Sequence, residues 1–280
     1  MHEMKRLNEW VKERERVLVM GVLNLTPDSF YDGGRYITPQ AAVARALAMV
    51  DEGADIIDVG GESSRPGALS ASVDEELARV IPVVEQIAHR SDILISVDTT
   101  KSAVAQAAIA HGASIINDIS ALRFDPNMGE VVARGATFLV LMHMRGRPQT
   151  MQQDPHYADV VAEIKRFLQE RMDVAISAGI DRKRLIVDPG IGFGKRLPHN
   201  LDILRGLASF NDLKVPILIG LSRKSFLGEI LDLPSSERLA GTIAANAIAI
   251  ANGADIIRVH DVKEGRRTAD VAIRLRNHAT

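Results

Sequence analysis

A short phrase recurs along this chain and restricts its fold more than any other feature. Gly53–Ile57, Gly112–Ile116 and Gly253–Ile257 all read Gly-Ala-x-Ile-Ile, where x is Asp or Ser, and Gly135–Leu139 is a looser copy. Each copy follows a stretch with helical periodicity, so its glycine is expected at a helix C-terminus and its apolar residues in the next strand. Because these apolar runs are continuous rather than alternating, we predict parallel strands that are buried on both faces.

The same pattern extends to about eight strand–helix units. The predicted strands lie near Val17–Leu23, Asp55–Gly60, Ile93–Val97, Ser114–Asn117, Thr137–Met142, Leu185–Asp188, Pro216–Leu221 and Asp255–Val259. Helix starts are marked by Thr38 with Pro39 and by Ser72 with Glu75, which form a capping box. These units in a chain of 280 residues favour an α/β fold of the (β/α)8 TIM-barrel type. A doubly wound open sheet is the alternative, because strand order cannot be read from a sequence.

Composition limits the organisation and the partners of the chain. No linker or low-complexity segment divides it, so we predict a single domain over residues 1–280, with residues 1–16 as an N-terminal extension. A net charge of −2 gives no electrostatic reason to expect nucleic acid as a partner. Cysteine is absent and residues 1–16 lack the apolar core of a signal peptide, which favours the cytoplasm. Ala240–Ala251 is too short to span a membrane and is predicted to be a buried helix.

Polar side chains stand at the end of nearly every predicted strand. They are Asn24, Asp58, Asp98, Asn117, Asp118, His143, Asp188, the run Ser222–Ser225, Arg258 and His260. In a parallel barrel these ends meet at one rim, where enzymes of this fold carry out their chemistry. Any one of these groups could be structural, but so many on one rim predict a shared site.

Two long loops at this rim have the composition of lids. The strand that begins at Val19 gives way at Asn24 to a loop rich in turn formers and side-chain oxygens, which ends at Gly34. The segment Gly60–Gly67 adds flexible glycines, hydroxyl groups and a fixed Pro66. An ordinary surface turn is the alternative for the first loop.

The rim residues fall into two chemical sets. Asp98, Asn117, Asp188 and Lys224 suit a flat heterocycle with an amino-pyrimidinone edge, because a carboxylate can accept two neighbouring N–H donors. Arg65, Arg223, Arg258 and His260 offer positive charge and donors to phosphate. Asn24 and the first loop offer oxygens to a metal ion, and Mg²⁺ prefers such ligands together with phosphate oxygens.

Two other patterns are weaker. Asp188–Lys195 resembles a phosphate-binding loop but lacks the GxxxxGK[ST] register, so a tight glycine turn that sets Phe193 at the pocket wall is the better interpretation. His143 lies between two methionines, and the sequence leaves open whether it contributes to the site or is a packed wall residue.

Eight phrases of the sequence, in this order, resemble the dihydropteroate synthase family. They are GVLNLTPDSFYDGG, DIIDVGGESSRPGA, ISVDTTK, INDIS, LMHMRGRPQTMQ, IVDPGIGFGK, GLSRKS and IIRVHDV, and they extend from about Val19 to Val262. One departure is Ser64, where members of the family often carry threonine. Because the hydroxyl group is kept, we expect a modified pocket for the second substrate rather than loss of activity.

The resemblance implies a TIM barrel that condenses 6-hydroxymethyl-7,8-dihydropterin pyrophosphate with p-aminobenzoate to give 7,8-dihydropteroate and pyrophosphate in folate biosynthesis. It places the pterin at Asp98, Asn117, Asp188 and Lys224, with Asp58 nearby. It places pyrophosphate and Mg²⁺ at Asn24, Arg258 and His260. It places p-aminobenzoate at Ser64, Arg65, Pro66, Phe193, Lys224 and Ser225. It also implies a homodimer and a target of sulfonamides.

The expected mechanism is a dissociative, SN1-like step in which Asp98, Lys224, Arg258 and His260 are the catalytic residues. Arg258, His260 and Mg²⁺ would stabilise the departing pyrophosphate, and Asp98 would stabilise positive charge on the pterin. The loops near Thr26–Arg35 and Gly61–Ser70 would close over bound pyrophosphate and exclude water. The alternatives are a pterin-binding barrel of the methyltransferase type and a pterin-binding paralogue without catalytic activity.

Overall fold

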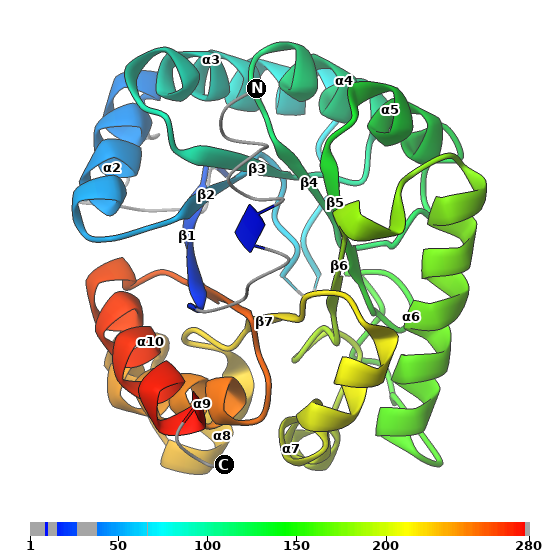
Figure 1. Cartoon of the computed structure of the whole chain (residues 1–280), viewed down its shortest axis with the longest axis vertical. Helices are drawn as coiled ribbons and strands as arrows, with labels where there is room; N and C mark the ends of the chain where they lie inside the picture. Colours follow the sequence, from blue (N-terminus) through cyan, green and yellow to red (C-terminus); the bar gives the residue numbers. More distant parts are fainter. Residues whose placement is uncertain (1–8, 11–15, 27–37, 66, 278–280) are drawn as a thin grey trace.

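The computed structural model describes residues 9–10, 16–26, 38–65 and 67–277. In this part of the chain, eight parallel strands form one sheet in the order β6-β5-β4-β3-β2-β1-β8-β7. The strands are β1 (Leu18–Asn24), β2 (Ile56–Gly60), β3 (Leu94–Asp98), β4 (Ile115–Asp118), β5 (Phe138–Met142), β6 (Leu185–Asp188), β7 (Leu218–Gly220) and β8 (Ile256–Val259). A parallel bridge between Val187 and Ile217 joins the two outer strands. The nearly closed barrel in Figure 1 confirms the (β/α)8 prediction, and the doubly wound alternative is wrong.

Helices surround the strands in Figure 1. They are α2 (Pro39–Asp51), α3 (Val73–Arg90), α4 (Ser102–Ala110), α5 (Met128–Gly135), α6 (Val160–Ser177), α7 (Leu197–Arg205), α8 (Ser225–Leu231), α9 (Leu239–Ala251) and α10 (Val262–Asn277). Short 3-10 helices lie at Arg182–Arg184, Leu207–Leu213 and Ser235–Glu237. Two helices, α8 and α9, separate β7 from β8, so this unit is longer than the simple repeat predicts.

The recurring glycines have the backbone conformation that the sequence predicts. Gly53, Gly112 and Gly253 have φ values of +101°, +110° and +107°, each two residues beyond the end of a helix. Glycine adopts this left-handed conformation without steric cost and so lets the chain turn into the next strand. The looser copy differs, because α5 continues through Gly135 and the left-handed residue is Ala136. The two helix caps are also confirmed, since Thr38 accepts from Ala41 N and Ser72 and Glu75 form the capping box.

Alternate residues of each strand enter two separate apolar layers. One set fills the interior of the barrel and comprises Leu18, Met20, Ile56, Ile115, Phe138, Val140, Ile186, Leu218 and Ile256. The other set packs against the surrounding helices. Trp10 also packs against the interior set, and its indole nitrogen donates to the carbonyl oxygen of Arg16 at 2.8 Å. This residue of the predicted N-terminal extension therefore contributes to the core.

The predicted helix Ala240–Ala251 corresponds to α9, but it is not completely buried. Ile243 and Ile248 are 37% and 56% exposed, so the prediction of a buried helix is wrong for one face. No helix in the described part of the chain is long and apolar enough to span a membrane.

Candidate active site

The carboxyl ends of the strands bring most of the predicted site residues to one mouth of the barrel. The parallel register aligns Asn24 with Gly60 and Gly60 with Asp98, and it aligns Asp98 with Asn117. Asp188 is aligned with Met142 at the end of β5, and Arg258 with Gly220 at the end of β7. Because all strands run in the same direction, these side chains share one rim.

Arg258 connects two carboxylates at the centre of this rim. Its Nε lies 2.6 Å from Asp58 Oδ2, and its Nη2 lies 3.0 Å from Asp98 Oδ2. The amide of Asn117 donates to the same Asp58 oxygen at 3.2 Å. Asp58 is fully buried, and its other oxygen has no hydrogen-bond partner among the described residues. Arg258 therefore holds Asp58 and Asp98 together, and Asp58 in turn fixes Arg258 and Asn117, which face the mouth.

Asp98 lies in an environment that favours its neutral form. Burial raises its pKa to about 7, and the negative charges of Asp58 and Glu76 add to this effect, whereas Arg258 opposes it. Its side chain still keeps 15% exposure at the mouth. Asp98 can therefore gain or lose a proton near neutral pH, and an adjacent positive charge would favour the carboxylate.

Asp188, Lys224 and Phe193 form a second group on the rim, at the end of β6 and in the turns that follow β6 and β7. Asp188 Oδ1 accepts the backbone N–H of Gly190 at 2.7 Å, and burial raises the pKa of this carboxyl while Lys224 lowers it. Lys224 Nζ donates to the carbonyl oxygen of Ile191 at 2.5 Å and lies 4.8 Å from the centre of the Phe193 ring. Burial lowers the pKa of Lys224 to about 8, although Asp188 favours the charged form. Lys224 Nζ is thus held by a carbonyl oxygen and an aromatic face, with the carboxylate of Asp188 close enough to act on its charge.

His260 is a neutral side chain rather than a cation. Burial lowers its pKa to about 4, and the positive charges of Arg258 and Arg223 contribute. Its Nδ1 lies 3.0 Å from the Ser222 hydroxyl, which fixes the ring. Arg223 itself binds Asp261 through two nitrogens, at 2.9 and 2.6 Å. The sequence-based view that both residues offer positive charge to phosphate therefore needs correction: His260 offers a ring nitrogen, and Arg223 is engaged by Asp261.

Asn24 is the residue with which the sequence predicts a metal site. A Cβ atom built on Gly60 would lie 3.7 Å from Asn24 Oδ1 and 3.7 Å from Asp98 Cβ, so both residues flank this glycine. Among the described residues, no group of three or more acidic or histidine side chains could hold a metal ion. A single amide oxygen still fits Mg²⁺, which commonly takes one or two protein oxygens and completes its shell with water and phosphate oxygens.

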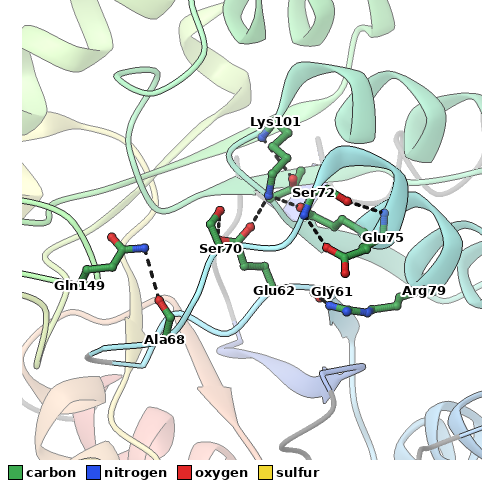
Figure 2. A network of polar contacts seen from close by, with 11 residues as sticks. Gly61, Glu62, Ala68, Ser70, Ser72, Glu75, Arg79, Lys101 and Gln149 are labelled. Carbon is green, nitrogen blue, oxygen red and sulfur yellow. Dashed lines mark hydrogen bonds and ion pairs between the residues drawn. The ribbon is translucent and has the colours of Figure 1, made fainter.

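The β2–α3 loop adds a cavity of about 260 Å³ beside Asp98. Ser64 and Thr99 line this cavity, as does Gln149 from the β5–α6 segment. Gln149 Nε2 donates to the carbonyl oxygen of Ala68 at 3.3 Å, so the loop contacts the β5–α6 segment (Figure 2). Pro66 lies outside the described residues, as does the first predicted lid, Thr26–Arg35, apart from Thr26 itself.

His143 is packed in the wall of the barrel, which favours the second of the two interpretations that the sequence left open. Its ring meets Phe167 edge-on at 4.8 Å, and its Nδ1 lies 2.9 Å from Lys195 Nζ. The same Nζ donates to the carbonyl oxygens of Gly190 and Phe193, at 2.8 and 2.9 Å. Lys195 thereby ties the glycine turn before α7 to the end of β5 and fixes the position of Phe193.

The structure thus gathers Asn24, Asp58, Asp98, Asn117, Asp188, Lys224, Arg258 and His260 at one mouth. Ser64 lines the adjoining cavity, and Arg65 and Ser225 are more exposed at the edge. Sequence reasoning missed the supporting roles of Glu62, Glu76 and Lys195. Glu62 and Lys195 each follow a glycine, and Glu76 lies in the first turn of α3. No local pattern identifies these residues, because Lys101 and His143, which they contact, are distant along the chain.

Comparison with known proteins agrees with this geometry. The family model described as "Pterin binding enzyme" matches residues 20–260. Dihydropteroate synthase of Escherichia coli K12 is 52% identical over 246 residues, which cover 88% of this chain and 87% of that protein.

Solved structures show the same similarity. The Yersinia pestis dihydropteroate synthase in complex with a sulfonamide drug has a TM-score of 0.91 and 44% identity, covering 94% of this chain and 96% of that one. The Xanthomonas albilineans dihydropteroate synthase with 4-aminobenzoic acid has a TM-score of 0.88 and 47% identity, covering 94% of each chain. The chain therefore belongs to the pterin-binding enzymes and, among them, to the dihydropteroate synthase family.

Proposed function

We propose that this chain condenses 6-hydroxymethyl-7,8-dihydropterin pyrophosphate with p-aminobenzoate to give 7,8-dihydropteroate and pyrophosphate. One observation carries the proposal: a single mouth holds carboxylate and amide groups that suit a pterin beside groups that suit its diphosphate. Asp98, Asn117 and Asp188 supply the first set, and Arg258 and His260 supply the second.

The pterin is assigned to the side of the mouth formed by β3, β4 and β6. Asp188 already accepts a backbone N–H through Oδ1, which orients the carboxylate, and its other oxygen can accept the ring N–H and amino donors. Asn117 presents an amide whose orientation is set by Asp58. Lys224 donates from the neighbouring β7–α8 turn, and its low pKa reflects a buried position that a flat ring would close further.

The diphosphate is assigned to Arg258, His260 and Asn24. Arg258 supplies a permanent charge, whereas His260 supplies a neutral ring whose protonation an arriving anion would favour. Mg²⁺ would be held by Asn24 together with phosphate oxygens, and it would neutralise charge on the leaving group. Arg258 must then exchange part of its contact with Asp98 for phosphate, which frees that carboxylate to face the pterin.

The reaction begins when the bond between the pterin methylene carbon and the pyrophosphate oxygen breaks, and the electron pair leaves with pyrophosphate. Asp98 stabilises the positive charge that spreads into the ring. The amine nitrogen of p-aminobenzoate then forms the new carbon–nitrogen bond and releases a proton. Phe193, Lys224 and Ser225 are assigned to p-aminobenzoate, together with Ser64 and Arg65 of the β2–α3 loop.

Pyrophosphate release is the direct test of this function. The purified chain, supplied with Mg²⁺ and both substrates, should release one pyrophosphate for each dihydropteroate formed. A barrel of the methyltransferase type would bind reduced folate and transfer a methyl group without releasing pyrophosphate. A paralogue without catalytic activity would bind the pterin and release nothing, and either result would refute the proposal.

We also propose a cytoplasmic location, a single domain over residues 1–280, and a homodimer.

The dimer is supported by an exposed apolar face on α9 and α10. Ile243, Val271 and Leu275 on this face are 37%, 62% and 69% exposed, and they line one shared groove. A second copy related by twofold symmetry would cover this face with the same face. Val271→Glu combined with Leu275→Glu should give a monomer in sedimentation velocity. If the wild-type chain already sediments as a monomer, the dimer proposal is wrong.

A further inference from the structure

The base of the β2–α3 loop is held by a network of side chains, which Figure 2 shows from close by. Glu62, near the start of the loop, accepts a hydrogen bond from the Ser70 hydroxyl at 3.0 Å, which joins the two ends of the loop and closes it. Arg79 of α3 donates to the carbonyl oxygen of Gly61 at 2.9 Å. The base is therefore fixed to α3, and Ser64 and Arg65 lie within the closed part.

Lys101 links this base to the segment that follows β3. Its Nζ forms an ion pair with Glu62 and lies 2.6 Å from Oε2 of Glu76, whose side chain is 1% exposed on α3. Burial opposes the charged form of Lys101, but the hydrogen bonds to both carboxylates outweigh it and raise the pKa of this lysine. Lys101 therefore remains an ammonium, and it stands three residues after Asp98 in the sequence.

The loop and the end of β3 also face the same cavity. Ser64 from the loop and Asp98 from β3 both line it, together with Lys101. Away from its base, the loop is attached to the β5–α6 segment by the hydrogen bond from Gln149 to Ala68. A displacement at the base would consequently change the position of Ser64 relative to Asp98.

We propose that Lys101, through Glu62 and Glu76, is a positioning residue for the second substrate. It holds the β2–α3 loop at a fixed position relative to the end of β3, so that Ser64 contacts p-aminobenzoate while Asp98 faces the pterin. This inference rests on the proposed function. Asn117 and Asp188 come from β4 and β6, outside the network, so loss of the network should weaken the second substrate and leave pterin binding intact.

Two variants remove the network in different ways. Glu62→Ala frees the loop but keeps the bond between Lys101 and Glu76, so the buried carboxylate stays paired and the fold is preserved. Lys101→Met removes the central ammonium, and Lys101→Arg restores the charge. Lys165→Met is the matched control. Lys165 lies on α6 and forms an ion pair with Asp212 of the 3-10 helix Leu207–Leu213, away from the mouth.

Steady-state kinetics and calorimetry separate the two substrates. Glu62→Ala and Lys101→Met should each raise the KM for p-aminobenzoate at least tenfold, with kcat within threefold of wild type. The Kd for pterin pyrophosphate with Mg²⁺ should stay within twofold, and Lys101→Arg should recover most of the KM. An unchanged KM for p-aminobenzoate would overturn the inference, and so would an equal rise in this KM and in the Kd for pterin pyrophosphate.

Hydrogen exchange tests the same inference without any turnover. In Glu62→Ala and Lys101→Met, backbone amides in residues 61–72 should exchange at least tenfold faster than in wild type, and in Lys165→Met they should not. Unchanged exchange in both variants would refute the proposed network. If the wild-type chain releases no pyrophosphate but the exchange result holds, the proposed function fails and the structural link between Lys101 and the loop stands.

Discussion

Replacing Asp188 with asparagine probes the proposed pterin contact with almost no change in shape. Asp188 is 4% exposed, and its Oδ1 accepts the N–H of Gly190 at 2.7 Å, a bond that the asparagine oxygen can keep. The remaining oxygen then becomes an NH₂ group that faces the N–H donors of the ring. The variant loses a charge-assisted hydrogen bond and sets donor against donor, which should weaken pterin binding by about 2–4 kcal/mol.

That loss corresponds to a rise of roughly 30-fold to 700-fold in the Kd for pterin pyrophosphate. Isothermal titration calorimetry in the presence of Mg²⁺ measures it directly. Asp202→Asn is the matched control, because this exposed carboxylate pairs with Arg205 on α7 and should leave the Kd unchanged. If Asp188→Asn binds within threefold of wild type while its thermal unfolding is unaltered, Asp188 does not hold the pterin.

Three further perturbations test other parts of the site. Arg258→Met leaves the carboxylates of Asp58 and Asp98 without the guanidinium that connects them. The free energy of unfolding, measured with urea at pH 7, should therefore fall by about 3–5 kcal/mol. A fall of less than about 1 kcal/mol would contradict the pairing. Burial raises the pKa of Asp98 to about 7 and lowers that of Lys224 to about 8. The value of kcat/KM for pterin pyrophosphate should therefore fall below pH 7, as Asp98 binds a proton, and above pH 8, as Lys224 loses one. A flat profile from pH 5.5 to 9 would count against both roles. Gly190→Ala should lower the free energy of unfolding by at least about 3 kcal/mol, because φ is +70° and the new Cβ would lie 1.9 Å from the carbonyl oxygen of His143. Gly67→Ala is the control, since φ is +80° but the space around it is open, and it should cost only about 1–2 kcal/mol. Equal losses of unfolding free energy in the two variants would rule out the close approach.

Much of the fold could be predicted because its determinants are local. The glycines at 53, 112 and 253 mark helix ends by a backbone conformation that few other residues adopt readily, and continuous apolar runs mark buried parallel strands. Once parallel strands are predicted, Asp98 and Asp188 must lie on the same rim. The closure between β6 and β7 could not be read in this way, because strand order depends on packing between distant segments.

The chemistry of individual side chains was less predictable, since it depends on partners far away in the sequence. Arg258 meets Asp58 across 200 positions, and Lys101 meets Glu62 across 39. The neutral state of His260 follows from burial beside two arginines, which no local pattern reveals. The sequence identified the types of groups at the mouth, whereas their charge states and supporting contacts required the three-dimensional arrangement.

A crystal structure with pterin pyrophosphate, Mg²⁺ and p-aminobenzoate tests the central claim most directly. It should place the pterin ring against Asp98, Asn117 and Asp188, and the diphosphate against Arg258 and His260 within the same mouth. A ring bound in another cavity, or a diphosphate that points away from Arg258, would contradict the account.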